Sequence, residues 1–140
     1  MIDFIASGGC VLLLDQWSKR MVELCAAYGC RSSAYLLRIP PVRNVSKSGK
    51  SNRDRVILVL IWAIAAASTL LLYRSGARFN SHIGRIAIGS ALGGAAGNLL
   101  DIWRRRFIVD FIDLRVWPVF NLADIAITAG IALSFWPGNH

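Results

Sequence analysis

Three nearby stretches, GGAAGNLLD (93–101), FIVDFIDLR (107–115) and FNLAD (120–124), place polar side chains within strongly apolar surroundings. These side chains are Asn98, Asp101, Asp110, Asn121 and Asp124. A carboxylate at the edge of a hydrocarbon layer is costly, so several that converge usually mark a functional site. These stretches therefore predict where membrane helices end and where the chemistry of this chain takes place.

The composition indicates a single membrane-embedded domain over residues 1–140. Of the 140 residues, 55% are hydrophobic, and the mean hydropathy is +0.49. The clearest span is the uncharged run VILVLIWAIAAASTLLLY at residues 56–73. As a helix, this run is long enough to cross most of a hydrocarbon core of about 30 Å.

Three further apolar segments each meet an acidic residue. Residues 4–14 lead into Asp15, residues 86–100 lead into Asp101, and Asp124 opens the last segment. Lipid-exposed backbone must satisfy its own hydrogen bonds, so we expect helices. The sequence thus predicts an all-α membrane protein with four transmembrane helices and its acids near helix ends.

The segment between the first and second helices is polar. Residues 31–55 are rich in Ser, Arg and Lys and contain Pro40-Pro41. Such a segment favours a small extramembrane connection, which can include short strands. Asp3 and the lack of a basic region before the first apolar segment argue for a retained first helix and against a cleaved export signal.

The net charge and the cysteine spacing limit which partners, metals and cofactors we expect for this chain. The net charge is +8, and in so apolar a chain phospholipid head groups fit this charge better than nucleic acid does. Cys10, Cys25 and Cys30 form no CxxC pair. We therefore expect no disulfide framework, no metal site and no cofactor.

Four spans would place both termini on one side of the membrane and the acid-bearing connections on the other. The basic residues concentrate in residues 19–55 and 104–115, whereas Arg74, Arg78 and Arg85 are the basic residues of the remaining connection. By the positive-inside rule, the acid-bearing connections would lie in the cytoplasm.

The spacing N-x-x-D occurs twice, at Asn98 and Asp101 and at Asn121 and Asp124. Three-residue spacing on a helix places both side chains on one face. Each helix can then offer an amide and a carboxylate to a common cavity, and Asp110 lies in the connection between them.

Two carboxyls within hydrogen-bonding distance share one proton, because both cannot ionise cheaply. One then acts as general base on a water while the other polarises a carbonyl, which is the chemistry of aspartic proteases. The alternative is that these acids only form interfacial ion pairs with nearby arginines. Those arginines are Arg104, Arg105, Arg106 and Arg115.

Two patterns indicate how the helices meet. Gly89, Gly93 and Gly97 recur every four residues, which is typical of membrane helices that pack backbone to backbone. Asp15 and Lys19 lie four residues apart in the order that favours pairing on a helix, either as a simple ion pair or as support for a site.

Taken in order, DQWSK (15–19), RN (43–44), GGAAGNLLD, IVDF (108–111) and FNLAD resemble the prolipoprotein signal peptidases, or signal peptidase II. This resemblance implies a four-helix protein that cleaves a lipid-modified prolipoprotein just before the diacylglyceryl cysteine. It further implies Asp110 and Asp124 as the catalytic dyad. By the same resemblance, further residues support the site or bind the substrate: Asp15, Asn44, Asn98, Asp101 and Asn121. Lys19 joins this set because it is expected to pair with Asp15.

The resemblance also implies a location: the bacterial cytoplasmic membrane, with the site on the outer side and both termini in the cytoplasm. This orientation opposes the charge rule, and we favour it because the basic connections can bind anionic head groups outside. The expected partners are the prolipoprotein and membrane phospholipid, with neither nucleic acid nor metal, and the protein is expected to be a monomer.

The sequence departs from the family pattern at two places. Asn44 is followed by VSKSGKSN where the family usually has an aromatic residue, and Ile102 stands where an Arg usually follows the Asp. These changes motivate an alternative, a non-catalytic paralogue that binds lipoproteins or lipids. A further alternative is a transporter that uses its acids as proton relays, although no inverted halves are evident.

Overall fold

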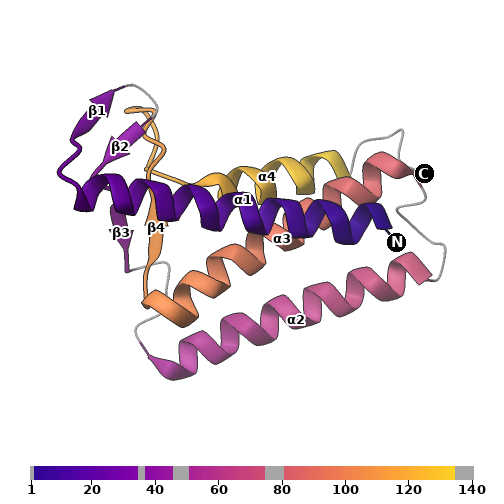
Figure 1. Ribbon diagram of the computed structural model, residues 1–140. Helices are drawn as coiled ribbons and strands as arrows, with labels where there is room; N and C mark the ends of the chain where they lie inside the picture. The colour runs from indigo at the N-terminus through magenta and orange to yellow at the C-terminus, as the bar shows by residue number, and fades with distance from the viewer. Residues whose placement is uncertain (1, 35–36, 46–50, 75–80, 135–140) are drawn as a thin grey trace.

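The computed structural model describes residues 2–34, 37–45, 51–74 and 81–134. These residues form four helices and four short strands, arranged as an elongated helical bundle with the strands at one end (Figure 1). The elements are α1 (Ile2–Ala27), β1 (Ser32–Ala34), β2 (Leu37–Ile39), β3 (Val42–Asn44), α2 (Asn52–Arg74), α3 (His82–Arg105), β4 (Ile108–Asp110) and α4 (Leu122–Ser134). The predicted four-helix class, with a small stranded segment between the first two helices, is confirmed.

The first helix is longer than the sequence predicted. Asp15 and Lys19 lie in the middle of α1, not at its end and in the following loop, because Lys19 neutralises Asp15 one turn away and neither Gly nor Pro interrupts residues 11–27. Helix α1 ends at Ala27, and the chain turns away from the helix at Gly29, which has a φ of +80°. The Cys30 N–H donates to the Cys25 carbonyl and the Gly29 N–H to the Ala26 carbonyl, a Schellman cap that needs this left-handed glycine.

The predicted glycine stripe is the contact between α3 and α1. A side chain at Gly89 would overlap the backbone of Phe4, and one at Gly93 would lie 2.7 Å from the Cα atom of Gly8. One turn later, a Cβ atom at Gly97 would lie 2.7 Å from the Asp15 carboxylate. Backbone packing of this kind is what small residues permit in membrane helices. It brings the polar middle of α1 directly against α3.

The fourth helix packs on another side of α3 in the same manner. A Cβ atom at Gly94 would lie 2.7 Å from the Ala123 carbonyl oxygen, and one at Gly130 would overlap the backbone of Ala87. Helix α3 is therefore the centre of the bundle, with α1 and α4 held close to it. This arrangement places the first turn of α4 beside the middle of both α1 and α3.

Helix α2 lies apart from the other helices (Figure 1) and makes few contacts with them. It exposes apolar side chains along its length. The Trp62 indole donates a hydrogen bond of 3.2 Å to the Leu92 carbonyl of α3. By length and composition, α2 over Asn52–Leu71 and α3 can each cross a membrane, and α4 is a shorter apolar helix. An apolar surface on all sides suits a helix that faces lipid.

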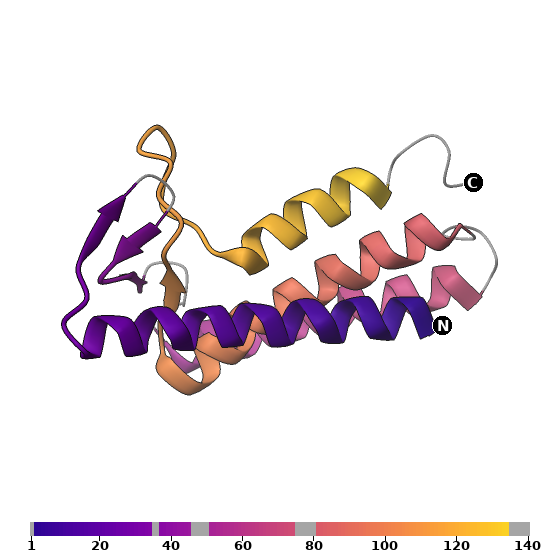
Figure 2. The same ribbon diagram turned by 45° about the horizontal axis from the view of Figure 1, so that its top comes forward.

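The strands and a small apolar core lie at one end of the bundle. Val22, Ile39, Phe111 and Ile112 are buried together there. Strand β3 pairs antiparallel with β4, so that Val42 lies opposite Asp110. The beginning of α1 and the end of α4 lie at the opposite end (Figures 1 and 2).

The glycine contact gives a test of the fold. Gly93→Ala should destabilise the protein by about 1–3 kcal/mol, because the added methyl group overpacks a backbone contact that has no room to relax. Gly9→Ala is the matched control, since no atom lies within 4 Å of a Cβ at that position. Thermal unfolding in detergent compares the two variants, and equal unfolding temperatures would contradict the close packing.

Candidate active site

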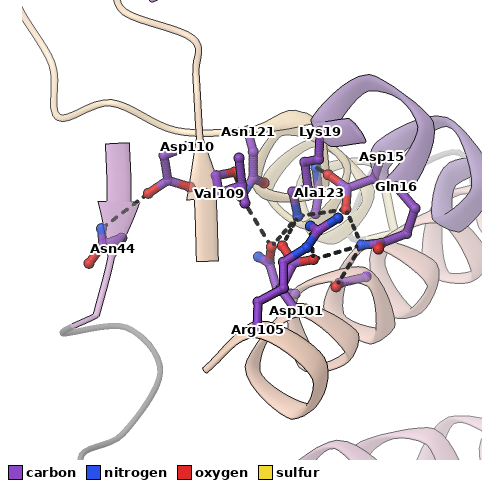
Figure 3. A network of polar contacts seen from close by, with 12 residues as sticks. Asp15, Gln16, Lys19, Asn44, Asp101, Arg105, Val109, Asp110, Asn121 and Ala123 are labelled. Carbon is purple, nitrogen blue, oxygen red and sulfur yellow. Dashed lines mark hydrogen bonds and ion pairs between the residues drawn. The ribbon is translucent and has the colours of Figure 1, made fainter. Parts of the chain in front are cut away.

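A network of polar side chains fills the region where α1, α3, α4 and the β3–β4 pair meet (Figure 3). It contains every residue that the sequence singled out for the site. The members are Asp15, Lys19, Asn44, Asn98, Asp101, Asp110, Asn121 and Asp124. The contacts among these side chains determine what chemistry the network can support.

Lys19 occupies the α1 side of the network. Its Nζ atom lies 2.6 Å from Asp15 Oδ2, 2.7 Å from Asp101 Oδ2 and 3.0 Å from Asn98 Oδ1. The side chains of Lys19, Asp15 and Asp101 have no exposed surface. The predicted pairing of Asp15 with Lys19 is confirmed, and Asp101 joins it from another helix.

Two further side chains complete this ion cluster: Gln16, which the sequence did not single out, and Arg105, which it named only as a possible ion-pair partner of the acids. Gln16 Nε2 donates to Asp101 Oδ1 at 3.0 Å and to the Gly97 carbonyl at 3.1 Å. Arg105 Nη1 donates to Asp101 Oδ1 at 2.8 Å. The four-residue spacing of Asp101 and Arg105 was a signal for this pair, whereas no local pattern indicated Gln16.

The two candidate catalytic carboxylates are connected through two amides. Asn121 Nδ2 donates to Asp110 Oδ1 at 2.8 Å and to Asn98 Oδ1 at 3.1 Å. Asn98 Nδ2 donates to Asp124 Oδ1 at 2.9 Å. Asp110 and Asn121 are fully buried, whereas Asn98 and Asp124 are half-buried. Asp110 and Asp124 thus belong to one continuous chain of hydrogen bonds.

The second N-x-x-D pair is not the pair on a helical face that we predicted. Asn121 precedes α4 and caps it, because its Oδ1 accepts the Asp124 N–H at 2.9 Å. An Asn at this position satisfies an otherwise unpaired helical N–H. The neighbouring Ala123 N–H donates to Asp15 Oδ1 at 3.0 Å. The start of α4 is therefore held both by its own cap residue, Asn121, and by Asp15 of α1.

Asn44 reaches the site from the strand pair. Its Nδ2 atom donates to Asp110 Oδ2 at 3.1 Å, so Asp110 accepts an amide N–H on each carboxylate oxygen. Arg43, beside it, lies over the Phe107 ring at 5.1 Å. Residues 46–50, most of the atypical polar stretch after Asn44, lie outside the described residues.

Two apolar hollows flank the first turns of α4. The first, of about 410 Å³, lies between α2, α3 and α4, and Trp62, Asn98 and Ile131 are among its lining residues. The second, of about 700 Å³, lies between α4 and the connection before it, with Asp124 and Trp117 in its lining. Apolar ligand groups can thus approach the polar cluster from two sides.

The described parts of the chain contain no group of three or more His, Cys, Asp or Glu side chains gathered as metal ligands. The acids of the network instead contact Lys19, Arg105 and the amides of Gln16, Asn44, Asn98 and Asn121. The arrangement holds carboxylates in fixed positions beside apolar space, which suits acid and base chemistry on an amphiphilic ligand.

This fold and site define a helical membrane enzyme with an acidic site at one end of its bundle. A solved structure of a bacterial membrane enzyme has the same fold, with a TM-score of 0.73 and 25% identity over 93% of this chain and 88% of that chain. A second such structure gives a TM-score of 0.68 at 24% identity.

The family follows from the sequence comparisons. Residues 8–137 match the family described as signal peptidase (SPase) II. A lipoprotein signal peptidase of Halothermothrix orenii is 40% identical over 125 residues, covering 88% of this chain and 86% of that protein. One of Pelotomaculum thermopropionicum is 34% identical over 133 residues, covering 90% and 84%. The chain belongs to the signal peptidase II family and is a membrane-embedded peptidase.

Asn121 has two roles, as the cap of α4 and as an amide donor to Asp110 and Asn98, and substitutions can separate them. Asn121→Ala removes both the cap of α4 and the amide bonds to Asp110 and Asn98, whereas Asn121→Ser restores a capping oxygen alone. We expect the Ser variant to be more stable than the Ala variant by about 0.5–2 kcal/mol. Chemical denaturation measures the difference, and equal stabilities would show that the cap contributes nothing.

Proposed function

We propose that this protein removes the signal peptide from lipid-modified prolipoproteins, and that Asp110 and Asp124 are its catalytic dyad. Relatives that share most of its length are named lipoprotein signal peptidases. The observation that carries the aspartic mechanism is the chain of hydrogen bonds from Asp110 through Asn121 and Asn98 to Asp124.

The proposed reaction is the hydrolysis of one peptide bond by water. One aspartate of the dyad takes a proton from the water while the other, protonated, donates a hydrogen bond to the scissile carbonyl. The hydroxyl adds to the carbonyl carbon, and the tetrahedral intermediate then expels the amine as it receives a proton. The new carboxyl ends the signal peptide, and the new amine begins the mature lipoprotein. The roles of base and acid are assigned to the dyad jointly.

The amides serve this reaction by holding the carboxylates in place. We predicted Asn98 and Asn121 as supporting or substrate-binding positions, and their side-chain N–H groups bind the two aspartates. Fixing catalytic groups before substrate arrives lowers the entropic cost of reaching the transition state. In the proposed enzyme, the asparagines therefore orient the dyad.

The two hollows suit a substrate with two apolar parts. A lipid-modified precursor carries a hydrophobic signal helix before the scissile bond and a diacylglyceryl group directly after it. The first hollow contains Asn98 in its lining and the second contains Asp124, so both open beside the dyad. Cleavage just before the diacylglyceryl cysteine then places one apolar part in each direction from the site.

We further propose that the protein lies in the bacterial cytoplasmic membrane, with the site outside and the chain ends in the cytoplasm. Strand β4, which ends at Asp110, lies with the other strands at one end of the bundle, opposite the start of α1 (Figure 1), and Asp124 lies in the first turn of α4. Arginines gather at the dyad end, among them Arg38, Arg43, Arg104 and Arg106. Anionic head groups of the outer leaflet would neutralise these arginines.

Removal of either dyad carboxylate should abolish cleavage. We expect Asp110→Asn and Asp124→Asn to remain folded yet to lose activity by at least about 10³-fold, since removing one member disables a unit that acts together. Release of a signal peptide from a lipidated precursor is the measurement. The matched control is Asp113→Asn, because Asp113 lies near the surface in the same connection and pairs with Arg38. Full cleavage by either dyad variant would refute the mechanism.

The same assay separates the non-catalytic alternative. A binding paralogue would retain the precursor without releasing a signal peptide, and wild-type protein would then behave like the Asp124→Asn variant. The intact network around the dyad, which includes Asn44 in the strand pair, favours the enzyme.

Membrane orientation can be tested at Cys30, which is exposed at the end of α1 near the strands. In cells that produce a C10S/C25S variant, a membrane-impermeant thiol reagent should label Cys30 without permeabilisation. A second variant that also carries Cys30→Ser controls for background labelling. Labelling of Cys30 only after permeabilisation would place the site in the cytoplasm.

A further inference from the structure

Lys19 lies outside the chain of hydrogen bonds that joins the dyad, but it contacts that chain at one atom, Asn98 Oδ1. Its Nζ atom donates hydrogen bonds to Asp15 Oδ2 at 2.6 Å and to Asn98 Oδ1 at 3.0 Å. It also lies 2.7 Å from Asp101 Oδ2, in an ion pair without hydrogen-bond geometry. An ammonium group has three N–H donors and no acceptor. Lys19 can therefore only donate to Asn98 Oδ1, and its charge is held there by two carboxylates.

The contact with Lys19 determines how the Asn98 amide is oriented. An amide side chain can exchange its oxygen and NH₂ group by a half-turn. Here Oδ1 of Asn98 accepts from Lys19 Nζ and also from Asn121 Nδ2 at 3.1 Å. The exchanged orientation would place an NH₂ group against two donors. Asn98 is therefore held with its Nδ2 atom directed at Asp124 Oδ1.

The ammonium itself cannot move away from this position. Lys19 is fully buried, and a buried charge that loses its partners costs several kcal/mol. Its two carboxylate partners come from α1 and α3, and the α1–α3 glycine contact fixes the distance between these helices. The orientation of Asn98 thus depends on an ion cluster that does not touch either dyad carboxylate.

We propose that Lys19 is a positioning residue for Asp124: its ammonium sets the orientation of the Asn98 amide, which in turn holds the Asp124 carboxylate for catalysis. This role rests on the proposed function of the dyad. Under this proposal a residue of α1 controls the catalytic rate, although α1 supplies neither aspartate of the dyad. Substrate affinity is expected to be independent of this contact.

The test needs variants that remove the ammonium without leaving a buried carboxylate unpaired. K19M/D15N removes one positive and one negative charge, while Asp101 keeps Gln16 and Arg105 as partners. The Asn that replaces Asp15 has one oxygen, which in K19M/D15N is available to the Ala123 N–H. D15N alone is the reference, and in it Lys19 keeps Asp101 and Asn98 as partners.

Initial rates of precursor cleavage in detergent should separate kcat from KM. We expect kcat of K19M/D15N to fall about 100-fold below that of D15N, as expected for a displaced catalytic group, with KM unchanged. K19Q/D15N should recover much of the rate, because its amide can again donate to Asn98. A merely structural lysine would change stability without lowering kcat of the folded protein, and its kcat would not distinguish Gln from Met.

Arg105→Gln is the matched control on the other side of the cluster. Arg105 pairs with Asp101 as Lys19 does, but its other ion-pair partner is Glu23, at 3.3 Å. We expect Arg105→Gln to lower stability and to lower kcat far less than K19M/D15N does. If it lowers kcat as much as K19M/D15N does, the effect belongs to the ion cluster in general and the proposal is wrong.

Further outcomes decide the remaining cases. A kcat for K19M/D15N within about threefold of D15N would overturn the role of Lys19, provided that wild-type protein cleaves the precursor. If D15N is itself inactive or unfolded, K19M/D101N is compared with D101N, with the same expectation. A wild-type protein that does not cleave at all would refute the proposed function, which is a result distinct from a fast K19M/D15N enzyme.

Discussion

The structure depends most on the buried charge of Lys19. In apolar surroundings an ammonium group is tolerated only when acceptors meet its N–H groups, and here these acceptors come from α1 and α3. The two helices must therefore approach more closely than ordinary side chains would allow. Gly8, Gly89, Gly93 and Gly97 permit that approach, because each lies against the partner helix with no room for a Cβ atom. The charge of Lys19 is thus compensated by acceptors from both helices, and the glycines let these helices come close enough to supply them.

The same region shows how helix capping and site geometry are combined. Asn121 uses its oxygen to cap α4 and its NH₂ group to hold Asp110 and Asn98. Asp15 uses one oxygen to bind Lys19 and the other to accept a backbone N–H at the start of α4. The groups that begin α4 are thus the groups that orient the carboxylates. A change in the position of α4 would change the site directly.

The departures from the family pattern have different consequences. Ile102, where an Arg is usual, is buried and lines the first apolar hollow. A guanidinium group nevertheless reaches Asp101, because Arg105 lies one turn later on the same helix and binds it at 2.8 Å. Asn44, which precedes the atypical stretch, donates to Asp110 at 3.1 Å. The network therefore contains a guanidinium on Asp101 and an amide on Asp110 beside the two departures.

The sequence by itself determined the four helices, the glycine stripe, the Asp15–Lys19 pair and the identity of the polar residues. The helices, the stripe and the pair follow from composition or from spacings of three or four residues, which are local properties of a helix. Among the polar residues, Asn44 and the choice of Asp110 and Asp124 as the dyad came from the resemblance to the family. Only the tertiary structure decided that Asp101 joins Lys19, that Asn121 is a cap and that Gln16 belongs to the cluster. These contacts join residues far apart in the chain, such as Gln16 with Asp101 and Asn44 with Asp110. They depend on how closely helices pack and how strands pair, and no local periodicity encodes either.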